Sequence, residues 1–239
     1  MAILIGLQRS FRQLGRIRIG TSVPGANGGK TPRRSNTFIL TSKDEAQIRR
    51  AAELFGGTVD QWNGEWRVVT AKDEIPVSLA PLPVSQFYEK WDGGKCVTRC
   101  DGVTDMKTGR PCHCDHSKRS TAEGRKNLCK LVTRMSVALP GLYDVGVWRV
   151  DTHSFYAASE LPGTIEVLRG LMATGQFVPA FLAMEIRKSG EKTYPVIAIR
   201  IRMTMDEMSS IGRGEKPLPA AAPTLERGAP QLPQFTEED

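Results

Sequence analysis

All five cysteines of this 239-residue chain lie in one short segment, from Cys96 to Cys129. Their spacing is C-x3-C, then eleven residues, C-x-C, and fourteen more residues before the last cysteine. The segment between them has almost no large apolar side chains, so it cannot bury a core of its own. Such a segment needs a cross-link to hold one structure, and clustered thiols can supply one by binding a metal ion together.

The composition around the cysteines favours a metal ion. Thiolate sulfur prefers soft or borderline ions, and a tetrahedral zinc site takes four such ligands. Residues 90–134 carry 11 basic and five acidic side chains, an excess that would balance the negative charge of zinc with four thiolates. We therefore expect one structural zinc ion. Four sulfur ligands would leave no open coordination position, so the site would not be catalytic.

The ligand set stays open, because five thiols compete for four positions. The candidates are Cys96, Cys100, Cys112, Cys114 and Cys129, of which four would bind the ion. His113 and His116 are also within reach. The alternative roles are small buried residues, or disulfides in an oxidising compartment. An iron–sulfur cluster is disfavoured because its usual C-x2-C runs are absent.

The chain shows no membrane or export signal. No apolar run approaches the roughly 20 residues that span a bilayer. The N-terminal "MAILIGL" has no basic stretch before it and no small-residue cleavage site after it. We expect a cytoplasmic protein, and in that reducing compartment clustered cysteines bind metal more often than they pair.

The net charge of +7 is concentrated in residues 1–35, which hold seven basic side chains and no acidic one. A basic arm suggests contact with nucleic acid or with an acidic partner surface. The candidate partner-binding residues are Arg9, Arg12, Arg16 and Arg18. The alternative is structural: "RIRIG" alternates, so Ile17 and Ile19 could belong to a strand whose arginines form its exposed face.

Hydrophobic patterning predicts an α+β fold. "TFILT" at 37–41 is typical of a buried strand, and Ser42 with Glu45 forms a capping box for a helix that Gly56 ends. Residues 65–79 predict one or two strands. Beyond the cysteines, 129–140 and 143–153 predict strands, 154–175 a helix broken or kinked at Pro162, and 177–204 a β-hairpin.

These elements group into two similar units that would form one composite domain, with the cysteine segment inserted between them. The predicted segments are a basic N-terminal arm (1–35), a β-α-β-β unit (36–90), a zinc-binding insertion (91–130), a β-β-α-β-β unit (131–205) and a Pro/Ala-rich disordered tail (206–239).

Signals for catalysis are absent. The chain has no G-x-S-x-G, H-E-x-x-H, G-x-G-x-x-G or phosphate-binding loop. None of its three histidines is paired by spacing with a nucleophile, and His153 precedes a predicted helix as a surface or capping residue would. We therefore expect a binding protein and not an enzyme.

Two runs resemble a known family. "GGKCVTRCDGVTDMKTGRPCHCD" and "CKLVTRMSVALPGLYDVGVWRVDTHSFYAASELPGT" are similar to the recombination directionality factors of Streptomyces and other actinobacterial temperate phages, which are often labelled only as metal-binding. The resemblance covers roughly residues 1–205 and includes the upstream "PVSQFYEKWDGG".

The resemblance implies a function. Such a factor binds the coiled-coil region of a large serine integrase on attachment-site DNA and switches it from integration to excision. The integrase performs all the strand chemistry in the bacterial host, and the factor biases one synaptic arrangement. The alternative is a zinc-stapled nucleic-acid-binding protein of phage DNA replication, whose basic arm would contact DNA directly.

Overall fold

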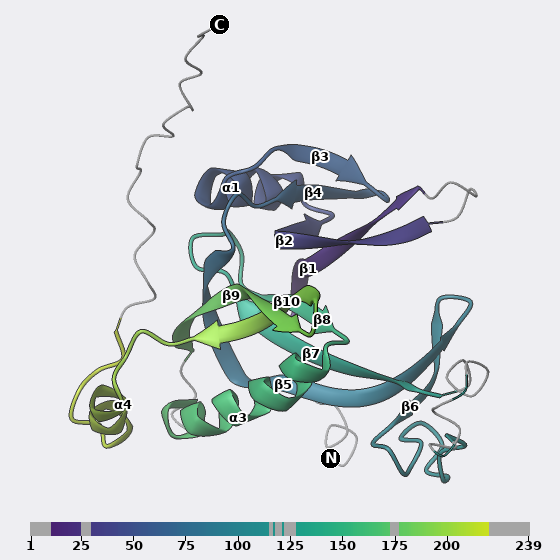
Figure 1. Ribbon diagram of the computed structural model, residues 1–239. Coiled ribbons are helices and arrows are strands. Elements are labelled where there is room, and N and C mark those ends of the chain that lie inside the picture. The colour runs from purple at the N-terminus through teal and green to yellow at the C-terminus, as the bar shows by residue number, and fades with distance from the viewer. Residues whose placement is uncertain are drawn as a thin grey trace, which may run out of the picture.

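The computed structural model describes residues 11–24, 30–114, 117, 121, 128–172 and 177–219. These residues form a ten-stranded mixed sheet with three helices, which confirms the predicted α+β class (Figure 1). The elements are β1 (Gln13–Pro24), β2 (Lys30–Ser42), α1 (Glu45–Phe55), β3 (Val59–Trp62), β4 (Glu65–Val69), β5 (Glu74–Asp92), β6 (Lys95–Cys100), β7 (Lys130–Ala138), β8 (Val147–Thr152), α3 (Phe155–Met172), β9 (Val178–Ser189), β10 (Lys192–Arg200) and α4 (Met205–Gly212).

The sheet is continuous, in the order β10-β9-β5-β7-β8-β1-β2-β4-β3, with β6 pairing to β5. All its pairings are antiparallel except that of β1 with β8. The elements of both predicted units therefore lie in one sheet, and the division into units stays a prediction. The long strand β5 runs as a curved band along the lower part of Figure 1 and pairs with β9, β6 and β7.

The sequence predicted one or two strands over residues 65–79. Strand β5 continues beyond this range, through a proline-containing stretch, to Asp92. Its pairing with β7 shifts register between Leu79 and Val84. Pro81 and Pro83 lie in that interval and have no backbone N–H to donate to a ladder. The irregularity therefore accommodates the prolines, and regular pairing resumes from Val84 to Glu89.

Helix α1 has the predicted position but a different cap. Asp44, and not Ser42, accepts hydrogen bonds from the backbone N–H groups of Ala46 and Gln47. The Ser42 hydroxyl is occupied elsewhere, because it donates to the Leu14 carbonyl at 2.7 Å. The helix ends at Gly56, whose φ of 75° suits glycine.

The core lies between the sheet and the helices. Helix α1 packs on β2, β3 and β4, whereas α3 packs on β5, β7 and β10. The largest fully buried side chains include Trp148, Phe38, Phe55, Ile17 and Met135. No helix among the described residues is long and apolar enough to cross a membrane.

Helix α3 is not broken at Pro162, because it runs through this proline from Phe155 to Met172. The other predicted effect, a kink, stays a prediction. A proline inside a helix leaves the carbonyl four residues earlier without its usual donor. Here that carbonyl belongs to Ala158, and the Gln86 side-chain amide donates to it at 2.6 Å. A partner from β5 thus replaces the lost helix bond.

Both ends of the sequence contain regular elements where the predicted segments were a basic arm and a disordered tail. Strand β1 occupies part of the predicted arm, and its Ile17 is buried in the core, as the structural alternative required. Helix α4 occupies the first residues of the predicted tail and begins with a capping box between Thr204 and Glu207. The predicted disorder beyond it falls mostly on residues 220–239, which lie outside the described residues.

Candidate metal centre

The β-sheet brings Cys100 and Cys129 to the same place. Strand β5 lies between β6 and β7 at this end of the sheet, so Tyr88 pairs with Cys100 on one side and with Leu131 on the other. Cys100 is the last residue of β6, and Cys129 immediately precedes β7. Two ligand candidates that are 29 positions apart in sequence are thereby anchored on strands that flank a common neighbour.

Two aspartates fold the loop that returns the chain to Cys112. The Asp101 carboxylate accepts hydrogen bonds from the N–H groups of Val103 and Thr104, both at 2.8 Å. Asp105 is buried and accepts from the Lys107 N–H at 3.1 Å and the Thr108 hydroxyl at 3.0 Å.

These hydrogen bonds hold the pKa of both carboxyls below its usual value. The backbone N–H of Cys112 closes the loop by donating to the Val103 carbonyl at 2.7 Å.

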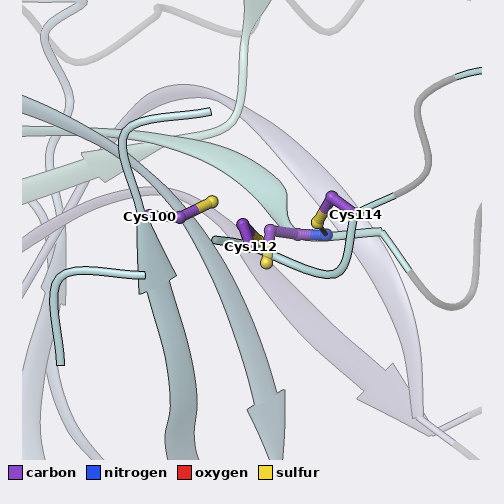
Figure 2. Close-up of side chains that lie close together, drawn as sticks. Cys100, Cys112 and Cys114 are labelled. Carbon is purple, nitrogen blue, oxygen red and sulfur yellow. Dashed lines mark hydrogen bonds between the residues drawn. The ribbon is translucent and has the colours of Figure 1, made fainter. Parts of the chain in front are cut away.

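Four thiols meet at this end of the sheet. The Sγ atoms of Cys100, Cys112, Cys114 and Cys129 all lie within 4.8 Å of one another. Figure 2 shows the side chain of Cys100 close to those of Cys112 and Cys114, which lie together on the loop that follows β6. The backbone N–H of Cys129 donates to the Cys114 sulfur at 3.1 Å. Four thiols at such distances could hold a metal ion.

The thiols differ in burial and in pKa. Cys100 and Cys129 are buried, whereas Cys112 and Cys114 are half-buried, and all five cysteines are free thiols. Burial raises the pKa of Cys100 to about 11 and raises the pKa of Cys129 as well.

At Cys112 burial also opposes ionisation. There, however, a hydrogen bond from the Cys114 backbone and further bonds from the neighbouring thiols lower the pKa overall. Four thiolates this close repel one another, so a bound cation is what would allow all of them to ionise.

Cys96 lies outside this group of four. It is four residues before Cys100 on the same strand, which corresponds to about 13 Å along an extended backbone. Its sulfur contacts the Thr98 carbonyl at 3.3 Å, and its own carbonyl accepts a hydrogen bond from the Lys107 side chain. Of the histidines, His113 is exposed and outside the group, and His116 lies outside the described residues.

A comparison with known families covers this part of the chain. The family model described as "Gp3-like: Recombination directionality factor-like" matches residues 14–202. The chain belongs to this family. The match spans nearly the whole sheet and all five cysteines, and the family name points to a role in recombination with a partner. No curated protein and no solved structure matched the chain.

An ionic network around the buried Glu89 joins strands of the sheet, and the sequence patterns did not reveal it. The Glu89 side chain on β5 is fully buried, and its carboxylate accepts hydrogen bonds from Arg99 at 2.9 Å, from Trp91 at 3.0 Å and from both terminal nitrogens of Arg134 at 3.2 Å. Arg134 also contacts Asp151 at 3.1 Å. The network joins β5, β6, β7 and β8 beside the cysteine segment.

The four predicted partner-binding arginines separate in the structure. Arg9 lies outside the described residues. Arg12 is exposed and pairs with Asp144 at 2.7 Å. Arg16 and Arg18 lie on β1.

Arg18 has contacts within the sheet. Its side chain stacks over the Trp62 ring at 5.1 Å and approaches Glu65 at 3.8 Å. Burial, followed by the charge of Arg16, lowers its pKa. At least Arg18 therefore has a structural role, and a signal for it was present in the alternation of "RIRIG".

Proposed function

We propose that this protein is a recombination directionality factor that binds a large serine integrase and switches it from integration to excision. The observation that carries this proposal is the family match across residues 14–202. The protein would act as a ligand that prefers one arrangement of the integrase subunits. Such a ligand changes an equilibrium by its differential affinity for the two states, and a few kcal/mol is enough.

The proposed cofactor is one structural zinc ion held by Cys100, Cys112, Cys114 and Cys129. In a tetrahedral site with zinc–sulfur bonds of about 2.3 Å, the sulfurs are about 3.8 Å apart. The four Sγ atoms, within 4.8 Å of one another, require only a small contraction. An all-thiolate set suits zinc better than magnesium or calcium, which prefer oxygen.

The proposed role does not require the protein to catalyse a reaction. A zinc ion with four thiolate ligands has no coordination position for water or substrate, so it would fix the segment between β6 and β7. Strand cleavage and rejoining would remain with the integrase. The protein would supply a folded surface, and its zinc would keep part of that surface in shape.

A second candidate is a nucleic-acid-binding protein of phage DNA replication. One observation favours it: β1 and β2 together contain five basic residues and no acidic one. Phosphate contacts would give an affinity for DNA that falls steeply with salt. The contacts of Arg18 with Trp62 and Glu65 weigh against this use of the strand, because a side chain engaged within the sheet is less available to phosphate.

The test uses purified protein with its cognate serine integrase and with DNA carrying attachment sites. We expect recombination between the hybrid sites to begin and integration to be inhibited. Both effects should saturate at a fixed ratio to integrase subunits and not to DNA. An unrelated serine integrase is the control and should not respond.

The result that contradicts the proposal is an integrase that neither binds the protein nor changes direction. If the protein alone then bound DNA with a steep salt dependence, the replication role would replace it. A variant with Cys112→Ser and Cys114→Ser should lose both effects, whereas Cys96→Ser should keep them.

A further inference from the structure

Strand β1 continues past the end of its neighbour β8. The parallel pairing of β1 with β8 stops at Ile17 and Val150, but β1 continues to Pro24. On its other edge it stays paired with β2, from Gly20–Arg34 to Pro24–Lys30. Among the described residues, no strand pairs with the β8-side edge of β1 after Ile17.

This edge is a source of hydrogen bonds. In a strand, alternate backbone N–H and C=O groups point to each side, so part of residues 18–24 points away from β2. Figure 1 shows β1 and β2 running side by side toward the thin grey trace that joins them. Proteins usually cover or interrupt such an edge, because it pairs readily with another extended segment.

A groove of about 680 Å³ lies along the start of this edge. One wall is the β1 stretch from Ile19 to Thr21, and the other is the turn from β8 into α3 together with Tyr194 and Pro195 of β10. The groove is therefore bordered by an unpaired strand edge on one side and by side chains on the other. None of its lining residues belongs to the group of four cysteines.

The far wall is aromatic. The rings of Tyr156 and Tyr194 stack with centroids 5.5 Å apart, and Phe155 meets Tyr156 edge-on at 6.1 Å. Phe155 is 73% exposed, an unusual fraction for an apolar ring of this size. On the near wall the hydroxyl oxygen of Thr21 is screened from solvent and has no hydrogen-bond partner among the described residues. The exposed ring of Phe155 would be covered by a ligand that offers an apolar side chain.

The hairpin is basic, and the carboxylate that lines the groove, Asp151, is already paired with Arg134 and Arg149. Strands β1 and β2 carry Arg16, Arg18, Lys30, Arg33 and Arg34 and no acidic residue. A second copy of the chain, pairing through the same edge, would bring two positively charged hairpins together, which is unfavourable. A segment that carries carboxylates would be attracted instead.

From these observations we infer that the β8-side edge of β1 binds an extended acidic segment of another protein, which adds a strand to the sheet. Backbone hydrogen bonds to residues 18–24 would give affinity, and an apolar side chain between Phe155, Tyr156 and Tyr194 would give specificity. The inference does not depend on the recombination role, because it rests only on the edge, the groove and the charge.

The test is selection of a random ten-residue peptide library, displayed on phage, against the full chain. We expect the enriched peptides to contain carboxylates and alternating apolar residues. As synthetic peptides they should protect amides of residues 18–24 from hydrogen exchange. N-methylation along the peptide should weaken binding at least tenfold at every second position only, because alternate amides face the edge of a paired strand.

Matched variants locate the peptide. The double change Phe155→Ala and Tyr156→Ala should weaken binding at least tenfold, whereas Tyr143→Ala, another exposed aromatic residue, should not. Circular dichroism checks that both variants fold. The inference is overturned if no peptide is enriched, if N-methylation shows no alternation, or if the double change has no effect. It is also overturned if removal of residues 220–239 is needed for binding, because the chain's own end would then be the occupant.

Discussion

The side-chain amide of Gln86 on β5 donates to the Ala158 carbonyl at 2.6 Å, four residues before Pro162 in α3. The same nitrogen lies 3.1 Å from the Thr133 hydroxyl on β7. One amide therefore connects two strands to the point in the helix where the backbone ladder is interrupted. This contact gives the helix its tolerance of an internal proline.

Changing Gln86 to Met should remove this contact while keeping a side chain of similar length. The Ala158 carbonyl would then lack a donor, and we expect a loss of about 1–3 kcal/mol in the free energy of unfolding. Urea denaturation measures it. In a Pro162→Ala background, where the helix supplies its own donor to Ala158, the loss should be smaller. An equal loss in both backgrounds would contradict this account.

Stability should depend on the ionisation of Glu89. Burial alone would raise its pKa, but the hydrogen bonds from Arg134, Trp91 and Arg99 outweigh burial and hold the pKa below its usual value. A carboxyl whose pKa is lower when folded stabilises the protein fully above the unfolded value of about 4.3. That contribution is lost as the pH falls through the folded value.

The measurement compares the wild type with Glu89→Gln by urea denaturation between pH 7 and pH 3. At pH 7 the variant should be less stable by about 1–3 kcal/mol, because Arg134 loses a charged acceptor. The difference should shrink below about pH 4.3. Any loss of metal in acid affects both proteins, so a difference that stays constant with pH would show that the charge of Glu89 is not what matters.

Removing two thiols should remove the metal. The purified protein is expected to contain about one zinc per chain, measured by elemental mass spectrometry. Cys112→Ser with Cys114→Ser should release it and open residues 101–128 to protease, because metal binding is what folds such a segment. Cys96→Ser is the matched control and should keep both metal and protection. Full zinc content in the double variant would rule out this ligand set.

The arginines of the N-terminal region should divide into structural and partner-binding residues. Arg18→Ala should cost about 1 kcal/mol of stability through its contact with Trp62, whereas Arg12→Ala should cost less than about 0.5 kcal/mol because its pair with Asp144 is exposed. Thermal unfolding separates the two.

The role of these arginines in partner binding is tested with a variant in which four of them are changed to alanine, namely Arg9, Arg12, Arg16 and Arg18. Binding to the integrase should weaken, and more so at low salt, where charge interactions are less screened. Arg18→Ala alone is the control for the loss of structure. Unchanged binding in the fourfold variant would leave β1 with a structural role only.

Helix α4 should contribute to stability and the residues after it should not. Met208 and Ile211 of α4 are partly buried and pack against the core. A chain that ends after Thr204 should lose about 2 kcal/mol, whereas a chain that ends after Pro219 should keep its unfolding midpoint. The Pro- and Ala-rich composition beyond that point offers little to bury. A lower midpoint for the chain that ends after Pro219 would show that the removed residues 220–239 contribute to stability.

The sequence by itself determined the features that depend on neighbouring residues. The α+β class, the helix from Glu45 to Phe55 and the hairpin of β9 and β10 follow from periodicity and from glycines that end elements. The crowding of five thiols into a segment without a core was equally visible, because spacing and composition are local properties.

Only the tertiary structure decided which distant residues meet. It placed Cys100, Cys112, Cys114 and Cys129 together and left Cys96 apart, because β6 ends and β7 begins beside the same residues of β5. It kept α3 continuous through Pro162, since Gln86 reaches the freed carbonyl from another element. It also buried Glu89 among arginines from two other strands. Such contacts join residues far apart in the chain, so no local pattern records them, and the pairing of strands decides them.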